Sequence, residues 1–223
     1  MSQVKSIHDD PRAARLAHEY HKAEERLRAH GVRHTILVMG STRAAPRERY
    51  YEVAREFGAL VARDGRAALM TGGGPGYMAA ANRGAFEAGG ASIGLNIRLP
   101  RAQPSNRYLT LGLQFRYFAL RKLHFLLRAR AMVAFPGGFG TFDELFETLT
   151  LAQTGKIAPL PVVLVGKAYW RRAVDFGFLV RSGTIRRRDL RLFRYAESAA
   201  EIWRAVAGAL PRRAPAARAR AKS

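Results

Sequence analysis

The chain has 223 residues, a length that suits one sizeable α/β domain, and it contains no run of about 18 apolar residues that could span a bilayer. It has no cysteine, which excludes disulfides, thiolate metal sites and cysteine nucleophiles together. The formal net charge of +21 would favour a nucleic-acid partner, but arginine recurs with alanine throughout the chain, so an arginine-rich solvated surface explains the charge more simply.

The N-terminal part of the chain predicts one amphipathic helix. Residues 1–10 lack the basic start, apolar core and cleavage site of a secretory signal, so we expect a cytoplasmic protein. Pro11 stands at a first-turn position, and apolar residues recur along one face of a helix over residues 11–30. We therefore expect an N-terminal helical extension over residues 1–31, ahead of a Rossmann-like domain over residues 32–210.

The first half of this domain alternates short apolar strands with helices. Apolar runs predict strands and helical periodicity predicts helices in the order strand 35–39, helix 46–63, strand 67–70, helix 77–88 and strand 91–95. The first two strands run into glycine-rich turns, Gly40-Ser-Thr-Arg43 and Thr71-Gly-Gly-Gly-Pro-Gly76. Glycines at such positions let the backbone adopt a positive φ and let a ligand approach without meeting a Cβ atom.

The second half continues the alternation and contains a third glycine turn, Pro136-Gly-Gly-Phe-Gly140. Its elements are predicted in the order extended segment 108–115, helix 117–130, strand 131–135, helix 141–154, strand 161–165, helix 168–181, strand 192–195 and helix 198–209. Short apolar strands separated by helices indicate an α/β fold, a Rossmann-like doubly wound parallel sheet with three layers, α/β/α. Residues 211–223 form a basic tail that we expect to be disordered.

All three glycine turns follow strands, and the carboxyl ends of parallel strands share one edge of a doubly wound sheet, so we expect the turns to converge on a ligand. The free N–H groups and the dipole of the helix after Gly140 favour an anion, most simply a phosphate. The glycines are not followed by the Gly-Lys-Ser/Thr of a Walker A loop, and no dinucleotide fingerprint is evident, so a mononucleotide or sugar phosphate is favoured over ATP or NAD. The six histidines form no recognisable metal motif, and we expect neither a metal nor a cofactor.

These motifs resemble those of the Lonely Guy (LOG) family of cytokinin-activating phosphoribohydrolases, whose members are also labelled possible lysine decarboxylases. Pro136-Gly-Gly-Phe-Gly-Thr-Phe-Asp-Glu144 is similar to the PGGxGTxxE signature of the family, and Gly72-Gly-Gly-Pro-Gly-Tyr-Met78 to its GGGxxGxM loop. Gly40 to Arg43 resembles its first-strand turn, and Arg121 with Lys122 matches an Arg-Lys pair on the helix before the signature. The resemblance covers about residues 33–180. It implies a Rossmann-like homodimer that hydrolyses the N-glycosidic bond of a nucleoside 5′-monophosphate, such as a cytokinin riboside 5′-monophosphate or AMP, to free base and ribose 5-phosphate.

The resemblance also implies that Arg121 and Glu144 are the catalytic residues. Breaking a glycosidic bond builds positive charge on the sugar, and a carboxylate near the anomeric carbon stabilises that charge and can position or deprotonate water. Glu144 suits this role. Arg121 would anchor the nucleotide or hold Glu144 ionised through its fixed positive charge. Without the motif, Arg121 reads as a surface arginine and Glu144 as an ordinary charge at a helix N-terminus.

A second set of residues is expected to bind the substrate. The backbone N–H groups of Gly137, Gly138, Gly140 and Thr141, together with the Thr141 hydroxyl, are expected to hold the 5′-phosphate. The other candidates are Arg43, Gly73, Gly74, Lys122 and Asp143. Asp143 would contact the ribose hydroxyls or simply begin the helix, and Met78 and Phe139 would line a base pocket or belong to the core.

Three other functions are open at this point. A nucleotide-binding or molybdenum-cofactor-binding protein would use the same fold without hydrolysis, although the presence of both Arg121 and Glu144 argues for catalysis. A nucleic-acid-binding protein would suit the charge of +21. Lysine decarboxylation needs a Schiff-base lysine, and neither Lys122 nor Lys156, near the glycine motifs, has a context typical of pyridoxal-phosphate binding. The preferred base is also open, because Leu120 and Phe125 depart from the shorter members of the family.

Overall fold

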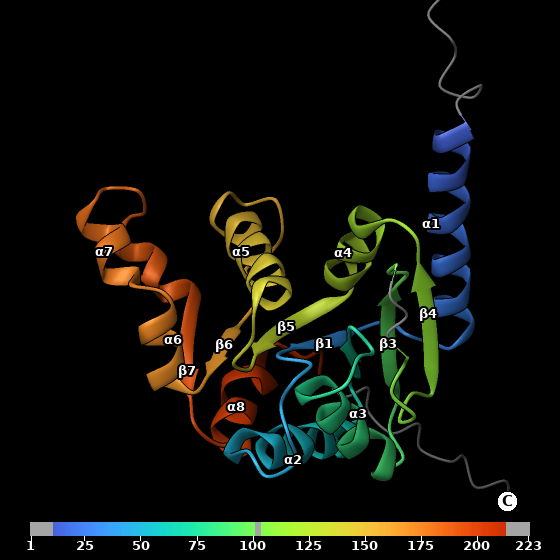
Figure 1. Cartoon of the computed structure of the whole chain (residues 1–223), viewed down its shortest axis with the longest axis horizontal. Coiled ribbons are helices and arrows are strands. Elements are labelled where there is room, and N and C mark those ends of the chain that lie inside the picture. The colour runs from blue at the N-terminus through green and yellow to red at the C-terminus, as the bar shows by residue number, and fades with distance from the viewer. Residues whose placement is uncertain (1–10, 101–103, 213–223) are drawn as a thin grey trace, which may run out of the picture.

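The computed structural model describes residues 11–100 and 104–212, which form a seven-stranded parallel sheet covered by helices on both faces (Figure 1). The strands lie in the order β4-β3-β2-β1-β5-β6-β7, so the direction of winding reverses between β1 and β5. This is the Rossmann-like, doubly wound α/β fold predicted from the alternation of elements. The strands are β1 (Thr35–Met39), β2 (Ala68–Thr71), β3 (Ser92–Ile97), β4 (Leu111–Phe115), β5 (Ala129–Ala134), β6 (Val162–Val165) and β7 (Phe193–Ala196).

Two helical layers cover this sheet, because alternate residues of each central strand point to opposite faces. In β1, for example, Leu37 packs into one hydrophobic cluster and Ile36 into the other. The first layer consists of α1 (Pro11–Ala29), α4 (Phe118–Leu127), α5 (Phe139–Gln153), α6 (Lys167–Ala173) and α7 (Phe176–Arg181). The second consists of α2 (Arg49–Asp64), α3 (Tyr77–Glu87) and α8 (Ala199–Val206). Two short 3-10 helices, η2 (Arg187–Leu192) and η3 (Ala207–Ala209), complete the described chain.

The N-terminal helix α1 packs into the main hydrophobic core. Ala23 and Leu27 are buried in the same cluster as the strands that it covers. Glu24 accepts two hydrogen bonds from the Arg128 guanidinium, at 2.7 and 2.8 Å, which join α1 to the end of α4. Residues 1–10 of the predicted extension lie outside the described residues, as does the predicted tail from residue 213 on.

The segment predicted as one helix over residues 168–181 is two helices, so that prediction is wrong. The break falls at Val174 and Asp175, and the Asp175 carboxylate accepts a hydrogen bond of 2.8 Å from the Phe178 N–H at the start of α7. An aspartate that caps a helix favours a new start at that point over continuation. In the part of the chain that the structure describes, no helix combines the length and the apolar composition needed to cross a membrane.

Candidate active site

The site lies at the carboxyl edge of the sheet, where the winding reverses between β1 and β5. The turns that follow these two strands are joined directly, because the Ser41 N–H donates to the Pro136 carbonyl at 2.9 Å. The Ser41 carbonyl in turn accepts from the Tyr77 N–H at 3.2 Å, which ties in the turn after β2. The three glycine turns therefore meet at one place, as the sequence predicts.

The turns surround a cleft of about 840 Å³. That volume is within the range of small-molecule sites. The cleft is also lined by parts of β3, α4, α5 and α6, so both sides of the switch point contribute to it. Of the sequence-predicted residues it is lined by Arg43, Gly74, Met78, Arg121, Gly137, Gly138, Phe139, Gly140 and Thr141.

The start of α5 forms one wall of the cleft and has the geometry of an anion cradle. The helix begins at Phe139, so the N–H groups of Phe139 and Gly140 precede the first helical hydrogen bond. A Cβ on Gly138 would meet nothing within 4 Å, which leaves room for a ligand to approach that backbone. A Cβ on Gly137 would lie 2.1 Å from the Thr141 hydroxyl oxygen, so glycine is required there for packing.

Two features of this cradle differ from the sequence-based expectation. The Thr141 N–H donates to the Gly138 carbonyl at 2.9 Å, so it is not free for a phosphate. The cradle also has a support that the motif does not include, because the Tyr169 hydroxyl donates to the Gly137 carbonyl at 2.5 Å. Tyr169 comes shortly after β6, the strand next to β5 in the sheet. A polar side chain just beyond the carboxyl end of that strand is the sequence signal that would have pointed to Tyr169.

Arg121 and Glu144 form a buried ion pair beside the cleft. Arg121 comes from α4 and Glu144 from α5, and the Arg121 Nη2 lies 3.4 Å from the Glu144 Oε1. The Arg121 guanidinium lies over the rings of Phe118 and Phe125, at 5.2 Å from each centroid. Arg121 lines the cleft, whereas Glu144, only 2% exposed, lies behind it. The predicted catalytic pair is therefore brought together, with the arginine toward the cleft.

Burial controls the protonation of this pair. Removal from water raises the pKa of Glu144 from 4.5 to about 7, although Arg121 and Lys122 act to lower it. Burial likewise lowers the pKa of Arg121, against the attraction of Glu144, and an arginine remains protonated at neutral pH even so. A carboxyl that titrates near neutral pH is suited to accept and return a proton.

Lys122 and Asp143, both predicted to bind substrate, bond to each other instead. The Lys122 Nζ lies 2.8 Å from the Asp143 Oδ1 and 3.4 Å from the Glu147 Oε2, and neither Lys122 nor Asp143 lines the cleft. Burial alone would lower the pKa of Lys122, but the hydrogen bond to Asp143 and the charge of Glu147 raise it overall. A Schiff-base lysine needs a lowered pKa, so Lys122 does not fit a pyridoxal-phosphate site.

Gly73 also departs from its predicted role. Its N–H donates to the Thr71 hydroxyl at 2.9 Å, and its carbonyl accepts from the Asn106 N–H at 2.8 Å. It adopts a φ of +73°, and a Cβ there would lie 2.8 Å from the Asn96 side chain. Gly73 thus shapes the loop, while Gly74 faces the cleft.

The cleft is also lined by the two apolar candidates, Phe139 and Met78. Phe139 is 97% exposed at its mouth, so it does not belong to the core, whereas Met78 is buried and lines the cleft as well. The exposed Arg43 side chain lines the cleft from the turn after β1. Asn96 and Phe118, which line the cleft from β3 and α4, were not singled out by sequence reasoning.

A family model and a relative of known activity each match part of the chain. Residues 78–206 match the model of a family described as "Possible lysine decarboxylase". Over 75 residues the chain is 40% identical to the cytokinin riboside 5′-monophosphate phosphoribohydrolase LOG2 of Arabidopsis thaliana. The aligned stretch covers 30% of this chain and 34% of that protein. The match thus spans about a third of that relative's length.

Solved structures of molybdenum-cofactor proteins share the fold. The molybdenum cofactor carrier protein of Chlamydomonas reinhardtii is 29% identical with a TM-score of 0.58, over 79% of this chain and 98% of that one. The molybdenum cofactor binding protein of Rippkaea orientalis is 19% identical with a TM-score of 0.57, over 78% and 94%, a likeness of fold alone. Since the family model spans more than half of the chain, the protein belongs to the family described as possible lysine decarboxylases, the LOG family that its glycine motifs resemble.

Proposed function

We propose that the protein hydrolyses the N-glycosidic bond of a nucleoside 5′-monophosphate, releasing a free base and ribose 5-phosphate. The buried Arg121–Glu144 pair beside the glycine cradle is the observation that carries this proposal. A cradle for a phosphate and a titratable carboxyl next to it are what this reaction needs. The partial match to LOG2 supports the same reaction class.

In this proposal the start of α5 binds the 5′-phosphate through the N–H groups of Phe139 and Gly140, which places the ribose against Arg121. The guanidinium orients the sugar and controls access to Glu144. Once ionised, the Glu144 carboxylate stabilises the positive charge that develops at the anomeric carbon, takes a proton from the attacking water and returns it to the nitrogen of the departing base. The base leaves toward Met78, Phe118 and Phe139, whose side chains line the cleft.

The test is incubation of the purified protein with AMP and, separately, with an isopentenyladenine ribotide, followed by chromatography of free base and ribose 5-phosphate. Glu144→Gln keeps the shape of the side chain and removes its charge, so we expect it to bind the nucleotide and release no base. Asp143→Asn, on the adjacent residue outside the cleft, is the matched control and should retain turnover. Equal release by Glu144→Gln and the unaltered protein would refute the assigned role.

A second candidate function is non-hydrolytic binding of a molybdenum cofactor. Its support is the carrier protein of Chlamydomonas reinhardtii, which is matched over 79% of this chain at 29% identity. The glycine cradle would hold an anionic group of such a ligand. A protein that binds AMP without releasing base, under conditions where binding is saturated, would favour this function over hydrolysis.

We also propose that the protein forms a homodimer through the outer face of α4. Leu123 and Leu127 lie four residues apart on one face of this helix and are 43% and 48% exposed, an apolar pair that the described part of the chain leaves partly uncovered. Light scattering should give twice the chain mass, and Leu123→Glu should reduce it to that of one chain. A single-chain mass for the unaltered protein at working concentration would contradict the dimer.

A further inference from the structure

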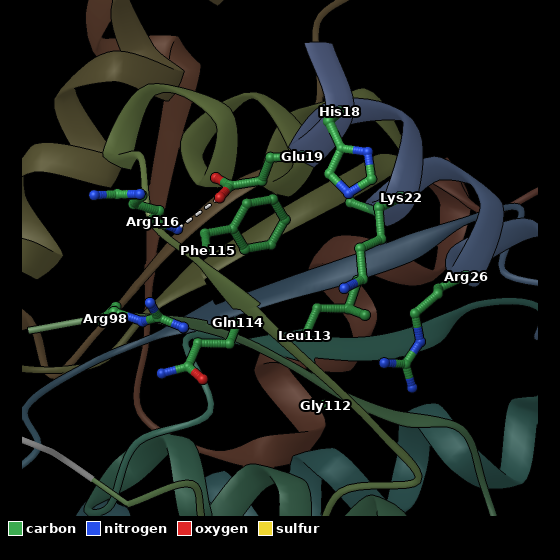
Figure 2. A pocket seen from close by; sticks show the side chains of 11 residues that line it. His18, Glu19, Lys22, Arg26, Arg98, Gly112, Leu113, Gln114, Phe115 and Arg116 are labelled. Atoms are coloured by element: carbon green, nitrogen blue, oxygen red, sulfur yellow. Dashed lines mark hydrogen bonds between the residues drawn. The ribbon is translucent and has the colours of Figure 1, made fainter. Parts of the chain in front are cut away.

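A second cavity lies away from the cleft, between α1 and the edge strand β4. It has a volume of about 400 Å³ and shares no lining residue with the cleft. Figure 2 shows the side chains that line it. One wall is formed by His18, Lys22 and Arg26, which lie four residues apart and therefore share one face of α1. The other wall is β4 itself, from Gly112 to Arg116. We call this cavity the edge groove.

The edge groove has an excess of unpaired positive charge. Lys22 and Arg26 reach down from α1 toward β4 in Figure 2, and Arg98 and Arg116 add two guanidinium groups from the ends of β3 and β4. None of these four side chains has an ion-pair partner among the described residues. The groove's carboxylate, Glu19, is already engaged, because it accepts from the backbone N–H groups of Arg116 and Tyr117 at 2.9 and 3.1 Å.

The edge groove also exposes unpaired backbone. In a parallel sheet, alternate residues of an edge strand direct their N–H and C=O groups toward the single neighbouring strand. The Phe115 carbonyl accepts from the Arg98 N–H at 2.8 Å, so Phe115, and by alternation Leu113, face β3. Gly112 and Gln114 must then direct their backbone groups outward, away from β3. The next residue in this alternation, Arg116, does so, because its backbone N–H donates to the Glu19 carboxylate of α1. Such an edge is a template for another strand.

From these two features we propose that the edge groove binds an extended acidic segment of a partner protein, which adds a short strand beside Gly112 to Gln114. The spacing of the charges suits this ligand. Cations four residues apart on α1 are separated by about 6 Å along the helix axis. Alternate side chains of an extended peptide are separated by about 6.6 Å, so acidic residues at every second position match the cations on α1. Main-chain hydrogen bonds to β4 would supply affinity, and the ion pairs between the groove and the acidic side chains would supply specificity.

The exposed strand edge favours a peptide over a nucleic acid. A nucleic-acid strand would use the cations, but it has no alternating N–H and C=O groups to pair with Gly112 and Gln114. The inference is independent of the proposed hydrolysis, because no residue of the groove belongs to the cleft.

The test is fluorescence anisotropy of the full chain with a labelled hexapeptide of alternating glutamate and valine. We expect saturable binding that Lys22→Glu with Arg26→Glu weakens about tenfold or more, since each reversal replaces an attraction by a repulsion. Arg188→Glu with Arg204→Glu, which changes the net charge equally outside the groove, is the matched control and should bind as the unaltered protein does. Circular dichroism would verify that both variants remain folded.

Two further ligands separate charge from strand addition. The same hexapeptide with N-methyl groups at alternate residues keeps its charge and loses half of its donors, so we expect it to bind much more weakly. The affinity for an oligothymidylate of six nucleotides should fall no further in the Lys22→Glu and Arg26→Glu variant than in the control variant. Equal affinity for the N-methylated peptide, or a preferred binding of the oligothymidylate at the groove, would overturn the proposal, as would failure of the acidic hexapeptide to bind.

Discussion

Replacing Glu144 by glutamine should stabilise the protein while it removes activity. A carboxyl whose pKa is raised by folding holds its proton more tightly in the folded state, so its contribution to stability is complete below about pH 4.5 and is lost as pH rises through about 7. The gap between 4.5 and about 7 corresponds to about 3 kcal/mol, at roughly 1.4 kcal/mol per pKa unit. Glutamine resembles the protonated carboxyl and does not ionise, so the variant does not lose this stability as pH rises.

The gain in unfolding free energy from Glu144→Gln should therefore depend on pH. We expect about 1 kcal/mol at pH 5.5 and about 3 kcal/mol at pH 8.5. Arg121 stays charged throughout, so its altered pairing does not produce this dependence. Urea titrations followed by circular dichroism at the two pH values would measure the gain. Asp143→Asn is the control, because Asp143 has a side chain that is 51% exposed. A gain that is the same at both pH values, or a loss at pH 8.5, would refute the reasoning.

Turnover of a nucleoside monophosphate should rise as pH increases through about 7, because the reaction uses the Glu144 carboxylate; a profile that is flat from about pH 6 to 8 would contradict this. Gly138→Val should leave the Tm nearly unchanged, since a Cβ there meets nothing within 4 Å, yet weaken ribose 5-phosphate binding about tenfold in calorimetry. Gly137→Ala should instead lower the Tm, because its Cβ would lie 2.1 Å from the Thr141 hydroxyl oxygen. Tyr169→Phe removes the hydrogen bond to Gly137 and should lower the unfolding free energy by about 1 kcal/mol in urea titrations. Unaltered stability and phosphate binding in that variant would show that the tyrosine does not support the cradle.

The fold was predictable because strands such as β1 and β6 are buried on both faces. Runs such as Thr35–Met39 and Val162–Val165 are buried at every position, so they read as short apolar segments between helices. The break between α6 and α7 was missed because Trp170 and Phe176, both buried, continue the apolar pattern across it. Only the capping aspartate at position 175 marks the interruption, and a single cap is a weak signal against a continuous pattern.

The site was predictable where backbone position determines the role, and less so where side-chain direction does. Lys122 and Asp143 each adjoin a proposed catalytic residue in sequence, but neighbouring positions on a helix point in different directions. They consequently meet each other outside the cleft while Arg121 and Glu144 meet beside it. Gly73 was assigned to the ligand because glycine permits close approach, and here the close approach is by Asn96.

The arrangement of α5 links the two parts of the proposed reaction. The N–H groups of Phe139 and Gly140 begin the helix, and Glu144 lies four residues beyond Gly140, a rise of about 6 Å along the axis. That rise is on the scale of a ribose 5-phosphate, so one rigid element would hold the phosphate at its end and bring the carboxyl level with the sugar. The relative position of cradle and carboxyl then depends on helix geometry and not on a mobile loop. A substitution that disturbs the start of α5 should therefore affect phosphate binding and turnover together, whereas Glu144→Gln separates them.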